Sequence, residues 1–206
     1  MNEADPMAGA RPVVRPRITV ESVTEFTPDD LNALCEAANA AIIDGGGFGW
    51  INPPEIGVLA SYFRGVLLVP ERELFVGRLD GVIVASAQLV LLPRNNEAQR
   101  FSATLTHAFT APYARGHGIG RMLVRKAEER ARMLHRYVLN LDVRETQEAA
   151  IRLYESMGFE RWGVHPAYAR VRGQTVRGFF YCKLLGRRGR ASAETGENNE
   201  GPGERP

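Results

Sequence analysis

Three glycines lie close together in the stretch Arg115-Gly116-His117-Gly118-Ile119-Gly120. The residues before it are extended and apolar in pattern, and those after it have the spacing of an amphipathic helix. Glycines let a backbone curl tightly and leave room for a ligand to approach it. The first N–H groups of a helix have no partners within the helix and lie at the positive end of its dipole. This order of strand, glycine loop and helix start therefore predicts a diphosphate-binding site.

The glycine spacing separates this loop from two common nucleotide motifs. The dinucleotide fingerprint G-x-G-x-x-G fails because Arg121 stands where its third glycine would be, and the phosphate-loop ending Gly-Lys-Ser/Thr is also missing. What fits is Arg/Gln-x-x-Gly-x-Gly/Ala, with Arg115, Gly118 and Gly120. On spacing alone, a simple tight turn that enters a helix is the alternative.

A second motif lies further along the chain. Residues 150–159 read Ala-Ile-Arg-Leu-Tyr-Glu-Ser-Met-Gly-Phe and fit A-x-x-L-Y-x-x-x-G-F. With both motifs in this order, the sequence resembles the Gcn5-related N-acetyltransferases (GNAT), whose glycine loop holds the pyrophosphate of acetyl-coenzyme A (acetyl-CoA). The patterns at 163–169 and 180–184 are similar to small-molecule acetyltransferases of the tabtoxin-resistance type.

The resemblance implies a set of cofactor contacts. Backbone groups of Ala108, Phe109 and Thr110 would bind the pantetheine arm between two diverging strands. Gln147 occupies the place of an asparagine in the family motif, and its longer side chain puts that contact in question. The loop itself would hold the pyrophosphate through Arg115, Gly116, His117, Gly118, Ile119, Gly120 and Arg121.

The resemblance also implies that Tyr154 is the general acid that protonates the departing thiolate. The general base is less defined. His107 titrates in the right range, although it could instead be a histidine of the core. Water relayed through backbone groups or Glu145 is the alternative base. The two cysteines, Cys35 and Cys182, have no neighbour in sequence that would activate them, which favours direct attack over an acyl-cysteine intermediate.

The acceptor pocket is expected from residues 48–52 and 165–168, with Trp50 and Tyr168 as its walls, although both could be ordinary core residues. The predicted activity is acetyl transfer to a primary amine of a small molecule or amino acid. Acetylation of a protein N-terminus or lysine is the nearest alternative, and a non-catalytic acyl-CoA sensor on the same fold is another. We expect no metal site.

These residues need a scaffold, and the periodicity predicts one. Helices are expected at 28–42, from 53, at 118–135 and at 146–157. Strands are expected at 17–23, 73–78, 82–92, 101–110, 137–143, 159–168 and 175–185. This is an α/β chain, and the resemblance implies the GNAT fold: a mixed, mostly antiparallel sheet of six to seven strands with helices on both faces.

Composition bounds the remaining possibilities. The chain has 206 residues and a formal net charge of only +2, with no basic stripe, so nucleic acid is not an expected partner. No apolar run approaches the roughly 18 residues that span a bilayer, and two cysteines make no disulfide framework. We therefore expect a cytoplasmic monomer or homodimer, with one domain at 17–185, a disordered arm at 1–16 and a disordered tail at 186–206.

Overall fold

The computed structural model describes residues 16–46 and 48–186, and the expected arm and tail lie outside them except for Pro16 and Gly186. The described chain forms one seven-stranded sheet in the order β1-β2-β3-β4-β5-β7-β6. The strands are β1 (Ile18–Val23), β2 (Arg72–Leu79), β3 (Val82–Leu91), β4 (Ser102–Thr110), β5 (Val138–Arg144), β6 (Glu160–Val171) and β7 (Gln174–Leu184). The helices are α1 (Pro28–Ile43), α2 (Ile56–Leu67), α3 (Ile119–Met133) and α4 (Glu148–Ser156), with short 3-10 turns at Glu97–Gln99 and Pro112–Ala114. The predicted fold class and element order are confirmed.

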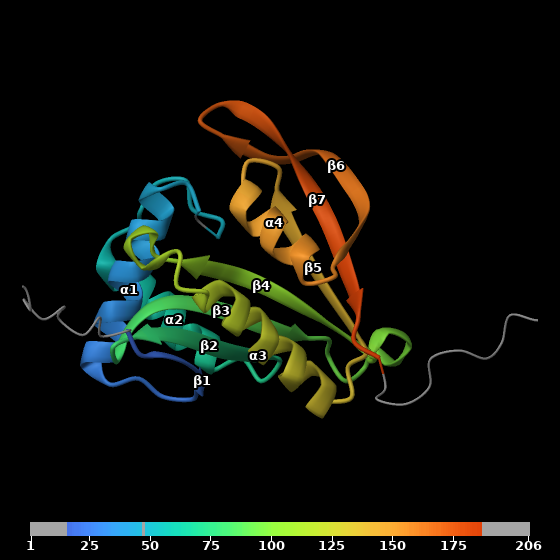
Figure 1. The fold of residues 1–206 in the computed structure, drawn as a ribbon, viewed down its shortest axis with the longest axis horizontal. Coiled ribbons are helices and arrows are strands. Elements are labelled where there is room, and N and C mark those ends of the chain that lie inside the picture. Colours follow the sequence, from blue (N-terminus) through green and yellow to red (C-terminus); the bar gives the residue numbers. More distant parts are fainter. Residues whose placement is uncertain (1–15, 47, 187–206) are drawn as a thin grey trace, which may run out of the picture.

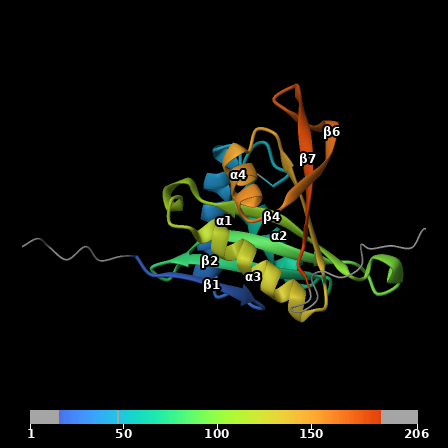
Figure 2. The same ribbon diagram turned by 45° about the vertical axis from the view of Figure 1, so that its right-hand side comes forward.

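The sheet divides into two parts at β4 and β5. All other neighbouring strands are antiparallel, whereas β4 and β5 are parallel and pair only from Ser102 to Thr104, opposite Val138 to Asn140. Beyond these three pairs the two strands diverge, and the β5-β7-β6 part rises away from the β1–β4 part (Figure 2). Helix α4 lies beside this division (Figure 1).

Helices cover both faces of the sheet, as Figure 1 shows. On one face, α1 and α2 bury a core that includes Leu34, Phe63 and Phe109. On the other face, α3 and α4 pack over a second core that includes Ile119 and Tyr154. The second core contains residues of both parts of the divided sheet, among them Leu105 of β4 and Leu141 of β5.

The ends of α1 and α3 follow from local sequence. Thr27 caps α1 by accepting a hydrogen bond from the Asp30 N–H at 3.1 Å, and Pro28 occupies the first helical position, where its missing N–H costs nothing. Helix α3 begins after Gly118, whose φ of 78° is one that glycine adopts readily. A Cβ atom on Gly77 of β2 would lie 2.4 Å from Cγ2 of Ile119, so only glycine lets α3 sit this close to the sheet.

None of the helices in the described part of the chain is long and apolar enough to cross a membrane. Both cysteines are free thiols; Cys35 is buried, and Cys182 is only half-buried.

Candidate functional site

A cavity of about 620 Å³ lies between the glycine loop, the end of β4 and the start of α4. Of the residues expected to bind a cofactor, it is lined by Ala108, Phe109, Thr110, Arg115, Gly116, Gly118, Ile119, Gly120, Arg121, Gln147 and Tyr154. We call it the first cavity. It brings residues from two motifs, about 30 positions apart, to one place.

The loop has the geometry that a diphosphate needs. Gly116 and Gly118 have φ values of +84° and +78°, and a Cβ atom on either would project into open space. No side chain caps the N-terminus of α3, so the N–H groups of its first turn are free of side-chain acceptors in the described structure. These N–H groups and the positive end of the dipole suit an anion. The residues present therefore fit the pyrophosphate of acetyl-CoA.

Several charged side chains surround the first cavity. Arg115 forms an ion pair with Asp44 at the end of α1, with 2.6 Å between Nη2 and Oδ2. Arg121 donates a hydrogen bond to Ser156 Oγ at 2.7 Å. Arg152, which sequence reasoning did not single out, also lines the cavity and pairs with Glu148 one turn earlier in α4.

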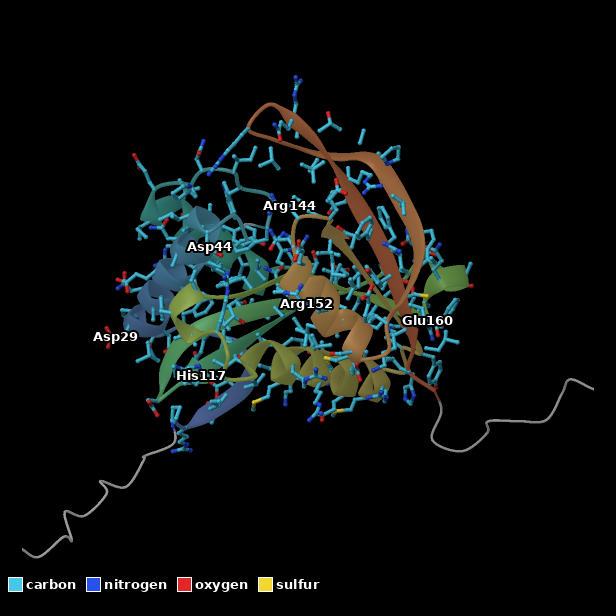
Figure 3. All side chains as sticks on the ribbon, turned by 45° about the horizontal axis from the view of Figure 1, so that its top comes forward. Asp29, Asp44, His117, Arg144, Arg152 and Glu160 are labelled. Carbon is cyan, nitrogen blue, oxygen red and sulfur yellow. The ribbon has the colours of Figure 1, made fainter. Side chains whose placement is uncertain are left out.

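The side chain of His117 is placed differently from its neighbours in the loop. It does not line the cavity; its Nδ1 lies 3.1 Å from the Arg115 carbonyl oxygen and 3.3 Å from that of Ala114. In Figure 3 it lies apart from Asp44 and Arg144. Any contact of His117 with a phosphate is therefore expected from its backbone and not from its ring.

A second cavity, of about 470 Å³, lies on the other side of the division between β4 and β5. It is bounded by Phe48, Gly49 and Ile51 from the α1–α2 connection, by β5, and by the 168–171 segment of β6. The two cavities share Gly46, Ala108, Gln147, Ala150 and Tyr154. A chemical group that lies between these five residues is accessible from both cavities.

Tyr154 lies at this junction. Its side chain is 7% exposed and packs edge-on against Phe159, with 5.8 Å between the ring centroids. Burial, and then the charge of Asp142, raise the pKa of Tyr154 to about 12. The hydroxyl therefore keeps its proton throughout the neutral range, as a general acid must.

His107 lines the second cavity from a bulge in β4. The register between β3 and β4 shifts at this point, and His107 has a φ of 51°, in the left-handed region. Its Nδ1 lies 2.9 Å from Thr106 Oγ1. Burial, followed by the charge of Arg72, lowers the pKa of His107, so the ring is neutral near pH 7 and can accept a proton.

Tyr168 lines the second cavity and donates a hydrogen bond to Oδ2 of Asp142 on β5. Burial and this hydrogen bond raise the pKa of Tyr168. Its side chain lies against Gly178 of β7, where an added Cβ atom would be 2.2 Å from Tyr168 Cγ. Gly178 thus provides the space that Tyr168 needs to reach Asp142.

Trp50 does not line either cavity. It packs edge-on against Phe48 and Tyr62, with ring centroids 5.4 and 5.2 Å away. Phe48, which does line the second cavity, also stacks on Phe109 at 5.1 Å. Trp50 therefore supports the wall of the second cavity, while Phe48 forms it.

Sequence reasoning missed three charged residues of the second cavity: Asp142, Arg144 and Arg170. Among the described residues that line this cavity, Asp142 is the one acidic side chain. Its charge affects the pKa values of His107, Tyr154 and Tyr168, so it lies near all three. The alternation of polar and apolar residues in 138–144 was a signal that one face of this strand is polar.

Glu145, an alternative base in the sequence analysis, lies elsewhere. It accepts hydrogen bonds from the backbone N–H of Arg177 at 3.0 Å and from its Nε at 2.7 Å, and these lower the pKa of Glu145. It lines neither cavity. A carboxylate held in this way is a poor proton acceptor.

The sequence of this chain is similar to those of known acetyltransferases. Residues 48–159 match the acetyltransferase (GNAT) family. An "Uncharacterized N-acetyltransferase in hisH-hisA intergenic region" from Azospirillum brasilense is 57% identical over 130 residues, which are 63% of this chain and 77% of that relative. The N-alpha-acetyltransferase RimI of Mycobacterium tuberculosis is 33% identical over 111 residues, 54% of this chain and 66% of RimI.

Among solved structures, a phosphinothricin acetyltransferase from Sinorhizobium meliloti in complex with acetyl-CoA superimposes with a TM-score of 0.66 at 22% identity. The match covers 82% of this chain and 89% of that one, and it shows a shared fold. Taken with the family match over more than half of the sequence, these findings establish that the chain belongs to the acetyltransferase (GNAT) family and is an acetyl-CoA-dependent acyltransferase.

Proposed function

We propose that the protein transfers the acetyl group of acetyl-CoA directly to a primary amine of a small molecule or an amino acid. The observation that carries this proposal is the meeting of two cavities at Tyr154. The first cavity has the glycine loop that suits a diphosphate, and the second has a carboxylate that suits an amine. A donor in the first cavity and an acceptor in the second could therefore approach the same point.

In this proposal the first cavity binds the donor. The N–H groups at the start of α3 hold the pyrophosphate, with Arg121 and Arg152 close enough to neutralise charge. Backbone groups of residues 108–110 bind the pantetheine arm, because β4 has no pairing with β5 beyond Thr104 in the described structure. When bound, acetyl-CoA supplies the acetyl group as a thioester.

Two protons have to move during the transfer. As the amine nitrogen bonds to the acetyl carbon and the carbon–sulfur bond breaks, Tyr154 donates its proton to the departing sulfur. The proton lost by the amine passes to Asp142, directly or through a water molecule, since Asp142 is open to solvent. Removing the proton from an amine of pKa near 10.4 costs about 4–5 kcal/mol at pH 7. A nearby proton acceptor is therefore needed.

Asp142 is the base that we favour over His107. A carboxylate attracts the protonated amine as well as accepting its proton, and Tyr168 fixes the orientation of this carboxylate. His107 is neutral and is the second choice. An acyl-cysteine intermediate is disfavoured because burial raises the pKa of Cys35 to about 11, which suppresses its thiolate.

The lining of the second cavity supports a small acceptor with an anionic group. Arg144 and Arg170 lie in the same cavity as Asp142, so positive charge exceeds negative charge there. Phe48 and Ile51 add an apolar surface. An amine that carries a carboxylate and an apolar side chain, as many amino acids do, would satisfy all three features.

Acetylation of a protein N-terminus is the second candidate, because the relative RimI, 33% identical over 111 residues, is named as an N-alpha-acetyltransferase. A free α-amino group is common to both acceptor classes. They differ in the carbonyl group next to it, which belongs to a carboxylate in an amino acid and to a neutral amide in a peptide.

A thiol-release assay with acetyl-CoA and matched acceptors tests the proposal. Amino acids should release coenzyme A faster than the corresponding amino-acid amides or tetrapeptides. Asp142→Asn should lower kcat/KM more than His107→Asn does. Faster turnover with peptides would favour the second candidate, and an unimpaired Asp142→Asn variant would remove Asp142 from the reaction.

A further inference from the structure

The carbonyl oxygen of Gly45, just after α1, accepts two side-chain hydrogen bonds. Nε2 of Gln147 donates to it at 2.8 Å, and Nη2 of Arg144 donates at 3.0 Å. A carbonyl oxygen has two lone pairs, so both donors can be accommodated. The donors come from the end of β5 and from the residue before α4, about 100 positions along the chain. Arg144 lies beside the end of α1 in Figure 3.

The neighbouring residue, Asp44, is held from a third direction. Its ion pair with Arg115 ties it to the glycine loop at 2.6 Å. The turn at 44–46 is also compact, because the Gly46 N–H donates to the Ala41 carbonyl at 2.8 Å and a Cβ atom on Gly46 would lie 3.2 Å from that oxygen. Side chains from three segments, those of Arg115, Arg144 and Gln147, therefore hold one short turn.

This turn leads into the wall of the second cavity. Gly46 lines both cavities, and Phe48, Gly49 and Ile51 line the second. Whatever fixes the carbonyl of Gly45 therefore fixes the start of the segment that contacts the acceptor.

The length of the Gln147 side chain decides whether this contact forms. An asparagine at 147 would be shorter by one methylene, about 1.5 Å. An amide nitrogen that is now 2.8 Å from the Gly45 oxygen would then lie about 4 Å away, beyond hydrogen-bond range. The extra methylene of glutamine thus has a specific effect in this chain.

We propose that Gln147 is a positioning residue, which with Arg144 clamps the carbonyl of Gly45 and so sets the acceptor wall at 48–51. The inference rests on the proposed role of the second cavity as the acceptor site. It differs from the role that the family resemblance gives to position 147, because the Gln147 amide nitrogen donates to the protein backbone. Gln147, which lines both cavities, and Arg144, which lines the second, thereby set the shape of the acceptor side.

The substitution Gln147→Asn tests this role, because it keeps the amide group and only shortens the side chain by one methylene. We expect KM for the best acceptor amine to rise about 5- to 20-fold, with kcat changed less than 3-fold. The Kd for coenzyme A, measured by titration calorimetry, should stay within 2-fold. Amide hydrogen exchange in residues 44–52 should become faster. Gln174→Asn, at the start of β7 and outside both cavities, is the matched control and should change none of these values.

Two outcomes would overturn the inference. A weaker Kd for coenzyme A with an unchanged acceptor KM would make Gln147 a cofactor ligand. Unchanged hydrogen exchange in residues 44–52 would show that the clamp does not hold the turn. The exchange and calorimetry do not depend on an acceptor, so they test the clamp even if no amine in the panel is acetylated and the proposed function fails.

Discussion

Gly178 of β7 offers a sharp test of the acceptor side, because its missing side chain makes room for Tyr168. In the substitution Gly178→Ala, the new Cβ atom would lie 2.2, 2.4 and 2.7 Å from Cγ, Cδ2 and Cβ of Tyr168. Carbon atoms in contact need about 3.5 Å, so the ring has to move by roughly 1 Å. The backbone of Gly178 is paired with His165 of β6 and Arg144 of β5 and cannot easily give way.

The expected loss follows from the hydrogen bond between Tyr168 and Asp142. A hydrogen bond to a charged group contributes about 1.5–3 kcal/mol. This one is solvent-exposed, so we take the lower end, which corresponds to about a 10-fold fall in kcat/KM. Overpacking should also lower the free energy of unfolding by about 1–3 kcal/mol. The Kd for coenzyme A should not change, because Gly178 and Tyr168 do not line the first cavity.

The assay is a double-mutant cycle with Tyr168→Phe, which removes the hydroxyl and keeps the ring. If Gly178→Ala acts by displacing that hydroxyl, it should lower kcat/KM about 10-fold in the wild type and less than 3-fold in Tyr168→Phe. Urea unfolding of each variant separates loss of fold from loss of activity. An equal effect in both backgrounds, or full activity in Gly178→Ala, would refute the reasoning.

Three further predictions concern the junction, the loop and the bulge. Tyr154→Phe should lower kcat about 10- to 100-fold and leave the Kd for coenzyme A unchanged, since only the donated proton is lost. Gly118→Glu should abolish coenzyme A binding in calorimetry, because the new side chain enters the first cavity at a φ of +78°, whereas Gly173→Glu, with a φ of +81° outside both cavities, should not. Burial lowers the pKa of His107, so the unfolded chain binds a proton at this side chain more readily than the folded chain does. The contribution of neutral His107 to the free energy of unfolding should be complete above about pH 6.5 and be lost as the pH falls below that value. His107→Asn should remove this part of the pH dependence in urea unfolding.

Each of these has a clear contrary result. Weaker cofactor binding without a change in rate would place Tyr154 outside the chemistry. Retained binding in Gly118→Glu would move the phosphates away from the loop. An unchanged pH profile in His107→Asn would show that other groups cause the loss of stability in acid.

The sequence predicted the glycine loop and its helix well, because both depend on local chemistry. Gly118 ends up at a positive φ before α3, and the apolar residues of α3 face the sheet as their spacing indicates. The order of strands and helices was also predictable, since each element carries its own periodicity. Only boundaries shifted, as in β6, which runs on to Val171.

The acceptor side depends on contacts that no local pattern reveals. Asp142 occupies an ordinary polar position on β5 and enters the site only because β4 and β5 part after Thr104. His107 faces the same cavity only because a bulge breaks the alternation of β4. Phe48 lines the second cavity and Trp50 packs behind it, because the path of the 48–52 connection depends on packing with Tyr62 and Phe109.

The incomplete pairing of β4 and β5 leaves part of each strand edge without a partner strand in the described structure. Unpaired strand edges usually recruit strands from other molecules and lead to aggregation. Here the unpaired parts of both edges face each other, beside α4 and the turn that begins at Asp44. The space between two such edges suits a slender, extended molecule, so the opening favours a thin ligand.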